Sequence, residues 1–206
     1  MALSDVETLI RAIDGLTGSG RKIIAIAGPP GAGKSTLASA IYDTMADRKL
    51  HAALVPMDGF HLDNSILQKS GYLDRKGAEF TFDANGFVHL IKRIRASEDN
   101  VIYPIFDRDR DLAIAGAGVV SKSVDIVLVE GNYLLLRQRP WQSLQPMFDL
   151  TIMLRPPLEE LRRRLTQRWV DLGFDEQQAI TKAEMNDIAN AHTVIDQSLA
   201  ADIVLT

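Results

Sequence analysis

The chain has no cysteine, and none of its apolar runs approaches the ~18 residues that a bilayer-spanning helix needs. The absence of cysteine excludes a disulfide framework, a Cys-ligated zinc site and thiol catalysis. Basic residues are also few: 23 Lys and Arg against 27 Asp and Glu disfavour a general nucleic-acid or anionic-membrane surface. Asp5 and Glu7 stand where a signal peptide would carry basic and then apolar residues. We therefore expect a cytoplasmic protein with neither a nucleic acid nor a membrane as its partner.

The rest of the composition is that of an ordinary globular protein. With 46% hydrophobic and 24% charged residues, the chain is too apolar to be disordered and too evenly mixed to be fibrous. A length of 206 residues, without repeats or a linker rich in Gly, Pro or Ser, predicts a single domain over residues 1–206. The sequence does not decide whether two copies associate, so a homodimer stays open.

Short apolar segments alternate with segments of helical spacing along the chain. Residues 22–27 and 124–129 are almost wholly apolar, which is typical of strands buried on both faces. Further strands are predicted at 52–57, 101–105, 150–154 and 203–205, and helices at 34–48, 87–95 and 159–169 and from a Ser4–Glu7 capping box to Gly15. The alternation predicts an α/β fold with a central parallel sheet covered on both faces. Residues 58–83 and 107–118 fit this sheet poorly and are expected to be functional loops.

A phosphate-binding loop follows the first buried strand and opens a helix. The eight residues that match G-x-x-x-x-G-K-[ST] are Gly28, Pro29, Pro30, Gly31, Ala32, Gly33, Lys34 and Ser35. Glycines let backbone N–H groups turn inward around a phosphate, and the helix N-terminus adds partial positive charge. Lys34 can reach the β and γ phosphates, and the Ser35 hydroxyl can hold Mg²⁺. A dinucleotide fingerprint is excluded because Thr36 stands where its third glycine would be. The loop, taken through Thr36, predicts ATP and Mg²⁺ as cofactors.

The class of nucleotide-handling protein follows from missing motifs. The chain has no Asn-Lys-x-Asp motif of GTPases, no Leu-Ser-Gly-Gly-Gln motif of ABC-type ATPases, and no protein-kinase motifs. A small P-loop kinase or a stand-alone ATPase remains.

Two carboxylates stand at the ends of predicted strands. Asp58 follows the strand at 52–57, and Glu130 follows the strand at 124–129. Ligands of an open parallel sheet bind beyond the carboxyl ends of its strands, so both acids are expected beside the phosphate-binding loop. A carboxylate there can accept a proton from an attacking hydroxyl and help to hold Mg²⁺. The alternative is a solvated or turn-capping role for each acid.

The order of these motifs resembles that of the uridine kinase, phosphoribulokinase and pantothenate kinase group. The resemblance covers about residues 22 to 206 and rests on the P-loop and on Asp58-Gly59-Phe60, Phe82-Asp83, Pro104-Ile105-Phe106-Asp107 and Val129-Glu130-Gly131. The amino-acid sequence at 57–64 and 130–135 is most similar to that of a bacterial nucleoside/nucleotide kinase subfamily. Some members of this subfamily are named as fructose-transport-associated kinases or fructokinases. The resemblance implies a P-loop NTPase fold with a helical lid at about 155–185. It also implies Asp58 as the general base, with Ser35, Asp58 and Glu130 around Mg²⁺.

The acceptor side of the expected site departs from uridine kinases. After Phe106-Asp107 those enzymes have an aromatic residue and a His that grip the base, whereas this chain has Arg108 and Arg110. Arg and Asp suit a polar, hydroxyl-rich or anionic acceptor better, although a solvated charged loop is the alternative. The candidate acceptor residues are His61, Phe82, Asp83, Phe106, Arg108 and Arg110. We expect Asp83 to hold an acceptor hydroxyl against Asp58, whereas His61 could equally be satisfied within a turn.

The basic segment 159–169 is predicted to be a helix whose Arg164 and Arg168, four residues apart, share one face. By resemblance it is part of the lid, which offers an arginine to the transferring phosphoryl group. We expect Arg164 to do so and Arg168 to contact the nucleotide, with Arg162 as another candidate. The alternative is a surface helix whose bases complement the helix dipole. The roles of Asn186 and Asn190 stay open.

Together these features predict a kinase that transfers the γ-phosphoryl group of Mg-ATP to an alcohol on a small metabolite. A sugar, with fructose as the named candidate, is the first choice of acceptor, and a nucleoside or a pantothenate-like alcohol is the second. The rivals are a sensor that binds ATP without transferring it and an ATPase that needs no acceptor.

Overall fold

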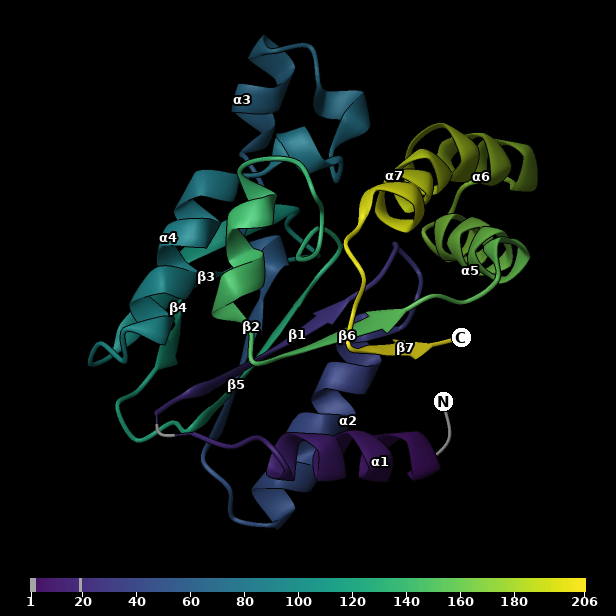
Figure 1. The fold of residues 1–206 in the computed structure, drawn as a ribbon. Helices are drawn as coiled ribbons and strands as arrows, with labels where there is room; N and C mark the ends of the chain where they lie inside the picture. Colours follow the sequence, from purple (N-terminus) through teal and green to yellow (C-terminus); the bar gives the residue numbers. More distant parts are fainter. Residues whose placement is uncertain (1–2, 19) are drawn as a thin grey trace.

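A sheet of five parallel strands forms the centre of the computed structural model, which describes residues 3–18 and 20–206 (Figure 1). The strands in spatial order are β2 (Ala52–Pro56), β5 (Ile126–Gly131), β1 (Lys22–Ala27), β6 (Leu150–Leu154) and β7 (Ile203–Leu205). The middle strand, β1, pairs with β5 on one side and with β6 on the other. Its N–H and C=O groups are therefore satisfied within the sheet, and all its residues except Lys22 are buried.

Alternation along β1 divides the core into two halves. Ile23 and Ala25 pack with one set of buried residues, and Ile24 and Ile26 pack with another. Helices α1 (Leu3–Asp14) and α2 (Lys34–Asp47) cover one face, and α4 (Ala84–Arg95) with the 3₁₀ helix Trp141–Met147 covers the other (Figure 1). These layers confirm the predicted α/β fold with a central parallel sheet. The predicted Ser4 capping box concerns a side chain outside the described part of the chain.

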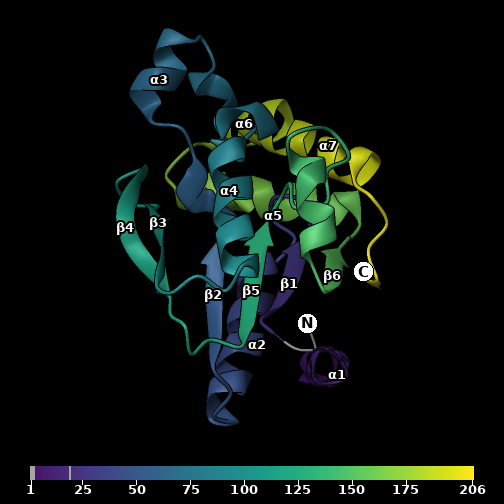
Figure 2. The ribbon, with the colours of Figure 1, turned by 60° about the vertical axis from the view of Figure 1, so that its left-hand side comes forward.

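The expected parallel arrangement is wrong for the strand at 101–105. It belongs to β3 (Val101–Asp107), which pairs antiparallel with β4 (Leu112–Val120) in a separate two-stranded ribbon at the side of the sheet (Figure 2). β4 escaped prediction because its sequence of apolar residues and two glycines shows no alternation of apolar and polar positions. Most of the expected loop at 107–118 is thus this ribbon, with a tight turn at residues 108–111.

Residues 61–81, here named the α3 arm, contain one short helix and two 3₁₀ turns. They are α3 (Asn64–Lys69), Leu73–Arg75 and Glu79–Thr81. Asp63 caps α3 by accepting a hydrogen bond from the Ser65 N–H at 2.9 Å. The arm rises above the carboxyl ends of the central strands, near the C-terminal helices (Figure 1).

The last helices form a group beside the arm, here named the C-terminal helical layer. It consists of α5 (Leu158–Asp171), α6 (Glu176–Lys182), the π-helical turn Ala183–Ile188 and α7 (Ala189–Gln197). α5 contains the helix that the sequence predicts at 159–169. Among the described residues, no helix has both the length and the apolar character needed to cross a bilayer.

Candidate active site

The phosphate-binding loop connects β1 to α2 at the carboxyl edge of the sheet. Gly31 has φ 75° and Gly33 has φ 93°, a left-handed backbone that glycine adopts without strain. A Cβ added at Gly31 would lie 3.1 Å from the Leu165 Cγ, so α5 packs directly on the loop. α2 begins at Lys34 without a side-chain cap, which leaves its N-terminus to an external anion.

Lys34 is buried at the floor of this loop, with only 8% of the residue exposed. Its Nζ donates a hydrogen bond to the Pro29 carbonyl at 3.0 Å. Burial lowers the pKa of Lys34, and the nearby carboxylates of Glu130 and Asp58 oppose this shift. The two strand-end acids that the sequence predicts beside the loop are therefore within electrostatic reach of its lysine.

Ser35 and Glu130 form a hydroxyl–carboxylate pair at the start of α2. The Ser35 Oγ lies 3.3 Å from the Glu130 Oε1, and burial raises the pKa of Glu130. Hydroxyl and carboxylate oxygens are hard ligands of the kind that Mg²⁺ prefers. In residues 3–18 and 20–206, no group of three His, Asp or Glu side chains is arranged to hold a metal ion by itself. These residues therefore fit an ion that takes most of its ligands from phosphate oxygens and water.

Asp58 lies in the 3₁₀ turn Met57–Phe60, which follows β2. A Cβ added to Gly59 would come within 2.1 Å of the Pro104 carbonyl oxygen, so this turn packs tightly on β3. The close approach brings the β3–β4 turn over Asp58, where the Arg108 Nη2 donates to the Asp58 Oδ2 at 2.7 Å. The Arg108 side chain is 69% exposed and, within the described part of the chain, has Asp58 as its one ion-pair partner, so this ion pair can open without disturbing the core.

His61 is held between two aromatic rings beside Asp58. Its ring centroid lies 4.1 Å from that of Phe82 and 4.6 Å from that of Phe106. The His61 Nδ1 is 2.7 Å from the Asp58 carbonyl oxygen, which can only accept, so Nδ1 carries the proton. Burial lowers the pKa of His61, which favours the neutral ring and leaves Nε2 as a hydrogen-bond acceptor.

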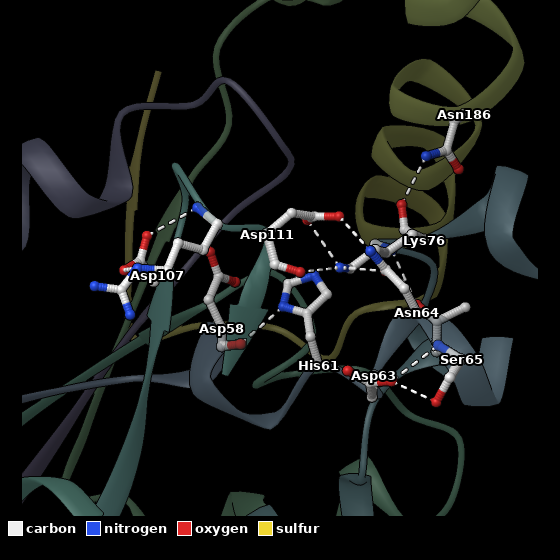
Figure 3. Close-up of polar contacts among 12 residues, drawn as sticks. Asp58, His61, Asp63, Asn64, Ser65, Lys76, Asp107, Asp111 and Asn186 are labelled. Atoms are coloured by element: carbon white, nitrogen blue, oxygen red, sulfur yellow. Dashed lines mark hydrogen bonds and ion pairs between the residues drawn. The ribbon is translucent and has the colours of Figure 1, made fainter. Parts of the chain in front are cut away.

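Lys76 of the α3 arm completes this group, and sequence reasoning missed it. Its Nζ contacts the Asn64 Oδ1 at 2.6 Å and the Asp111 Oδ1 at 2.8 Å, and it lies 5.1 Å from the Phe106 ring centroid (Figure 3). The Asn64 Nδ2 in turn donates to the Asp111 Oδ2 at 2.8 Å. A single lysine in a loop of mixed charge carries no sequence signal for such a cluster.

Two residues predicted for the acceptor pocket lie elsewhere. Asp83 caps α4 by accepting from the Gly86 N–H at 2.8 Å, and its neighbour Phe82 pairs with His61 in a β-bridge. Held at the start of α4, Asp83 lines a cavity of about 480 Å³ together with Phe82 and Arg139. This placement differs from the one expected beside Asp58.

Arg110 is the second of these residues. It is 70% exposed and pairs with Asp107 at 3.3 Å. The segment that carries Arg108 and Arg110 is a tight turn rather than an extended strand, so the two arginines have different partners.

The arginines of α5 also have different partners. The Arg164 Nη1 donates to the Gly31 carbonyl of the phosphate-binding loop at 3.1 Å. The Arg168 Nη2 donates to Asp187 of the π-helical turn at 2.8 Å, and Asp187 is buried. Arg162 pairs with Glu159 and Glu184 on the exposed side of the helix. Arg164 is thus the lid candidate that contacts the loop, whereas Arg168 ties α5 to the π-helical turn.

Asn186 and Asn190, which the sequence left without a role, bind the α3 arm. The Arg75 Nε donates to the Asn186 Oδ1 at 3.1 Å, and the Arg75 Nη2 donates to the Asn190 Oδ1 at 3.3 Å. The Asn186 Nδ2 donates to the Lys76 carbonyl at 2.8 Å. These contacts join distant segments of the chain: Lys76 and Asn186 are 110 residues apart, and Arg75 and Asn186 are 111 residues apart.

Comparison with known proteins agrees with this geometry. The crystal structure of a "putative fructose transport system kinase" from Silicibacter sp. TM1040 superimposes with a TM-score of 0.92 at 40% identity, over 100% of both chains. A "possible uridine kinase" from Bacillus stearothermophilus shares the fold, with a TM-score of 0.76 at 19% identity over 100% of both chains. A "putative uridine kinase" of Schizosaccharomyces pombe is 31% identical in an alignment 204 positions long, which covers 95% of this chain and 87% of that protein.

The match to a family model extends through nearly all of the described site. The model of the phosphoribulokinase/uridine kinase family covers residues 23–206, from the strand before the phosphate-binding loop to the last strand. The chain therefore belongs to the phosphoribulokinase/uridine kinase family, and it is a kinase that transfers a phosphoryl group to an alcohol.

Proposed function

We propose that this kinase transfers the γ-phosphoryl group of Mg-ATP to a hydroxyl group of a sugar, with fructose as the first candidate. The observation that carries the proposal is the placement of Asp58 within electrostatic reach of Lys34, under a turn that presents Arg108 rather than an aromatic ring. The acceptor oxygen forms a bond to the γ-phosphorus, and the bond to the bridging oxygen of ADP breaks. The acceptor proton passes to the Asp58 carboxylate.

The phosphate-binding loop supplies the ATP side of this proposal. Backbone N–H groups of residues 31–36 would cradle the β and γ phosphates, with Lys34 as a fixed charge below them. Ser35, Asp58 and Glu130 would hold Mg²⁺ together with phosphate oxygens. The bound ion offsets negative charge on the phosphates. Catalysis is then mostly positioning and charge stabilisation.

The helices beside the loop act as a lid in this proposal. Arg164 already reaches the Gly31 carbonyl, so a small movement of α5 would bring its guanidinium to the transferred phosphoryl group. Closure of residues 155–185 would also keep water from the γ-phosphate and so limit ATP hydrolysis. Arg168 supports this lid through Asp187 and lies close enough to Lys34 to lower the pKa of that lysine.

A sugar fits the acceptor side better than a flat base. The Phe106 ring is already contacted by His61 and by the Lys76 ammonium group, and Phe82 is buried against His61. The polar groups near Asp58 are instead an exposed arginine and the acceptor nitrogen of a half-buried, neutral histidine, which suit hydroxyl groups. The name of the Silicibacter protein, at 40% identity, supports fructose as the first sugar to test.

A screen of coupled ADP release tests the proposal directly. Sugars, nucleosides and pantothenate are compared at fixed Mg-ATP, with the acceptor-free rate subtracted, and Asp58→Asn serves as the inactive control. We expect turnover with fructose or another sugar, and its loss in Asp58→Asn with ATP affinity kept. A nucleoside as the best substrate would overturn the sugar assignment. Equal ATP consumption with and without acceptors would indicate an ATPase, and no turnover in either protein would indicate a sensor.

A further inference from the structure

The α3 arm contacts the C-terminal helical layer through a partly buried polar cluster. Arg75 donates to the side-chain oxygens of Asn186 and Asn190, and Asn186 donates to the Lys76 carbonyl. A guanidinium only donates and a carbonyl only accepts, so these partners fix the orientation of the Asn186 amide. Asn190 is 2% exposed, and Gly77, the next residue of the arm, accepts from the Tyr133 hydroxyl in the core at 2.6 Å. The contact is therefore directional and anchored.

The same arm contacts the β3–β4 turn one residue further along. Lys76 binds Asp111 at 2.8 Å, and Asn64 binds the other carboxylate oxygen of Asp111 at 2.8 Å (Figure 3). Asp111 ends the turn that also carries Arg108, whose guanidinium holds Asp58. A shift of this turn therefore changes two contacts together, the one between Arg108 and the Asp58 carboxylate and the one between Asp111 and Lys76.

The C-terminal helical layer transmits a shift at Asn186 to the phosphate-binding loop. The residue after Asn186 is Asp187, which accepts hydrogen bonds from Arg168 at 2.8 Å and from the Trp169 Nε1 at 2.7 Å. Both donors belong to α5, whose Arg164 lies one turn earlier and donates to the Gly31 carbonyl at 3.1 Å. Movement of the π-helical turn thus changes the position of α5 relative to the phosphate-binding loop.

We propose that Arg75 and Lys76 are positioning residues that couple the acceptor-side turn at Asp111 to the helices over the phosphate-binding loop. The two residues are adjacent at the end of one 3₁₀ turn, so neither the Asp111 contact nor the Asn186 contact can shift alone. Occupation of the acceptor side would then favour one placement of α5 over the nucleotide, and nucleotide would favour one placement of the turn, by the same factor. The inference rests on the proposed nucleotide site but not on the identity of the acceptor.

Binding of Mg-AMP-PNP, measured by titration calorimetry without any acceptor, tests this coupling. Lys76→Met and Asp111→Asn lie on the acceptor side, yet each should weaken AMP-PNP affinity about fivefold or more because α5 loses its preferred placement. Lys76→Arg keeps the cation and should restore most of the affinity, which a defect in folding would not allow. Lys122→Met is the matched control, because Lys122 only pairs with Asp99 at the surface.

A double-mutant cycle separates coupling from independent effects. Arg75→Leu cuts the contact to the C-terminal helical layer, and its combination with Lys76→Met should weaken binding no further than the stronger single variant. If Arg75→Leu folds poorly, Asn186→Ser removes the same contact by changing the residue in the C-terminal helical layer. AMP-PNP affinity of Lys76→Met within twofold of the unmodified protein, or strict additivity in the cycle, would overturn the inference. Failure of the acceptor screen is a separate result, since this measurement needs no acceptor.

Discussion

The guanidinium of Arg108 holds the Asp58 carboxylate at 2.7 Å, across 50 residues of chain. Such a contact orients the carboxylate and also competes with an acceptor hydroxyl for the same oxygen. With Asp58 as the proposed general base, Arg108 would act on the acceptor side, whereas Arg110, which pairs with Asp107 three residues away, would not. The two arginines, which look equivalent in the sequence, are expected to differ in their effect on catalysis.

Arg108→Ala is predicted to lower kcat/KM for the acceptor by about tenfold to a hundredfold, because the loss of one charged contact at a reacting group is worth about 1.4 to 3 kcal/mol. The KM for ATP should stay nearly unchanged. Arg110→Ala should change kcat/KM for the acceptor less than threefold. Steady-state kinetics with the best acceptor from the screen measure both variants. Equal losses in the two variants would mean that the whole turn, rather than its contact with Asp58, recognises the acceptor.

Lys34→Ala is predicted to abolish phosphoryl transfer, since it removes the buried charge below the β and γ phosphates. A loss of at least about a hundredfold in kcat is expected from a missing group of this kind. ATP affinity should weaken as well, and a quenched-flow assay of single turnovers with a titration of ATP separates the two effects.

Ser35→Ala is predicted to raise the Mg²⁺ concentration needed for half-maximal activity, because the hydroxyl beside Glu130 would be lost as a ligand. At saturating Mg²⁺ much of the activity should return, which distinguishes this variant from Lys34→Ala. An unchanged Mg²⁺ dependence would contradict the assignment of Ser35 to the metal site.

The parts of the fold and site that could be predicted are those determined by neighbouring residues. β1, the phosphate-binding loop and the start of α2 form one continuous segment in which apolar runs, glycines and helical spacing all act locally. Asp58 and Glu130 were expected beside the loop because parallel strands place their carboxyl ends at one edge. This rule needs only the strand boundaries.

The parts that could not be predicted depend on contacts between distant segments. Arg75 and Asn186 are 111 residues apart, and no periodicity in either segment points to the other. β4 consists of apolar residues and two glycines without any alternation, yet it is exposed along most of its length, so its sequence does not indicate that it pairs with β3. The capping role of Asp83 has a local signal, an acid directly before an apolar helical segment, but the resemblance implies a role on the acceptor side for the same residue.

Arg168→Ala is predicted to lower the free energy of unfolding by about 2 kcal/mol, because it leaves the buried Asp187 carboxylate with the Trp169 Nε1–H and without its cation. The value is moderated by the partial exposure of Arg168. Gln167→Ala is the control, since Gln167 is exposed on the same helix and donates to Asp171 at the surface, and it should leave stability nearly unchanged. Urea denaturation at neutral pH measures both. An equal loss in the control would show that helix propensity, and not the buried carboxylate, is being measured.

Glu160 makes part of the stability of α5 dependent on pH. Hydrogen bonds from Arg163 and Arg164 lower the pKa of Glu160 from 4.5 to about 2. Because the pKa in the folded chain lies below that of the unfolded chain, this stabilisation is fully present above pH 4.5 and is lost as the pH falls through about 2. The difference in free energy of unfolding between the unmodified protein and Glu160→Gln should follow that course in urea denaturation. A difference that persisted at pH 2 would contradict it.

Glu160→Gln should also lower kcat at neutral pH, since Arg164 loses the carboxylate partner that holds it toward Gly31.

Gly59→Ala tests whether the close packing of the Asp58 turn on β3 sets the geometry of the acceptor side. The added Cβ would lie 2.1 Å from the Pro104 carbonyl oxygen, and because this atom belongs to the backbone, β3 must move away. We expect a loss of about 2 to 3 kcal/mol in the free energy of unfolding, as for other overpacked sites. The remaining folded protein should have a higher KM for the acceptor, because the Arg108 turn moves with β3, while the KM for ATP changes little. Gly71→Ala provides the control: it has open space but a φ of 73°, so it carries backbone strain without the clash and should leave the acceptor KM unchanged. Equal acceptor KM values in the two variants would show that Asp58 and Arg108 keep their relation independently of this packing.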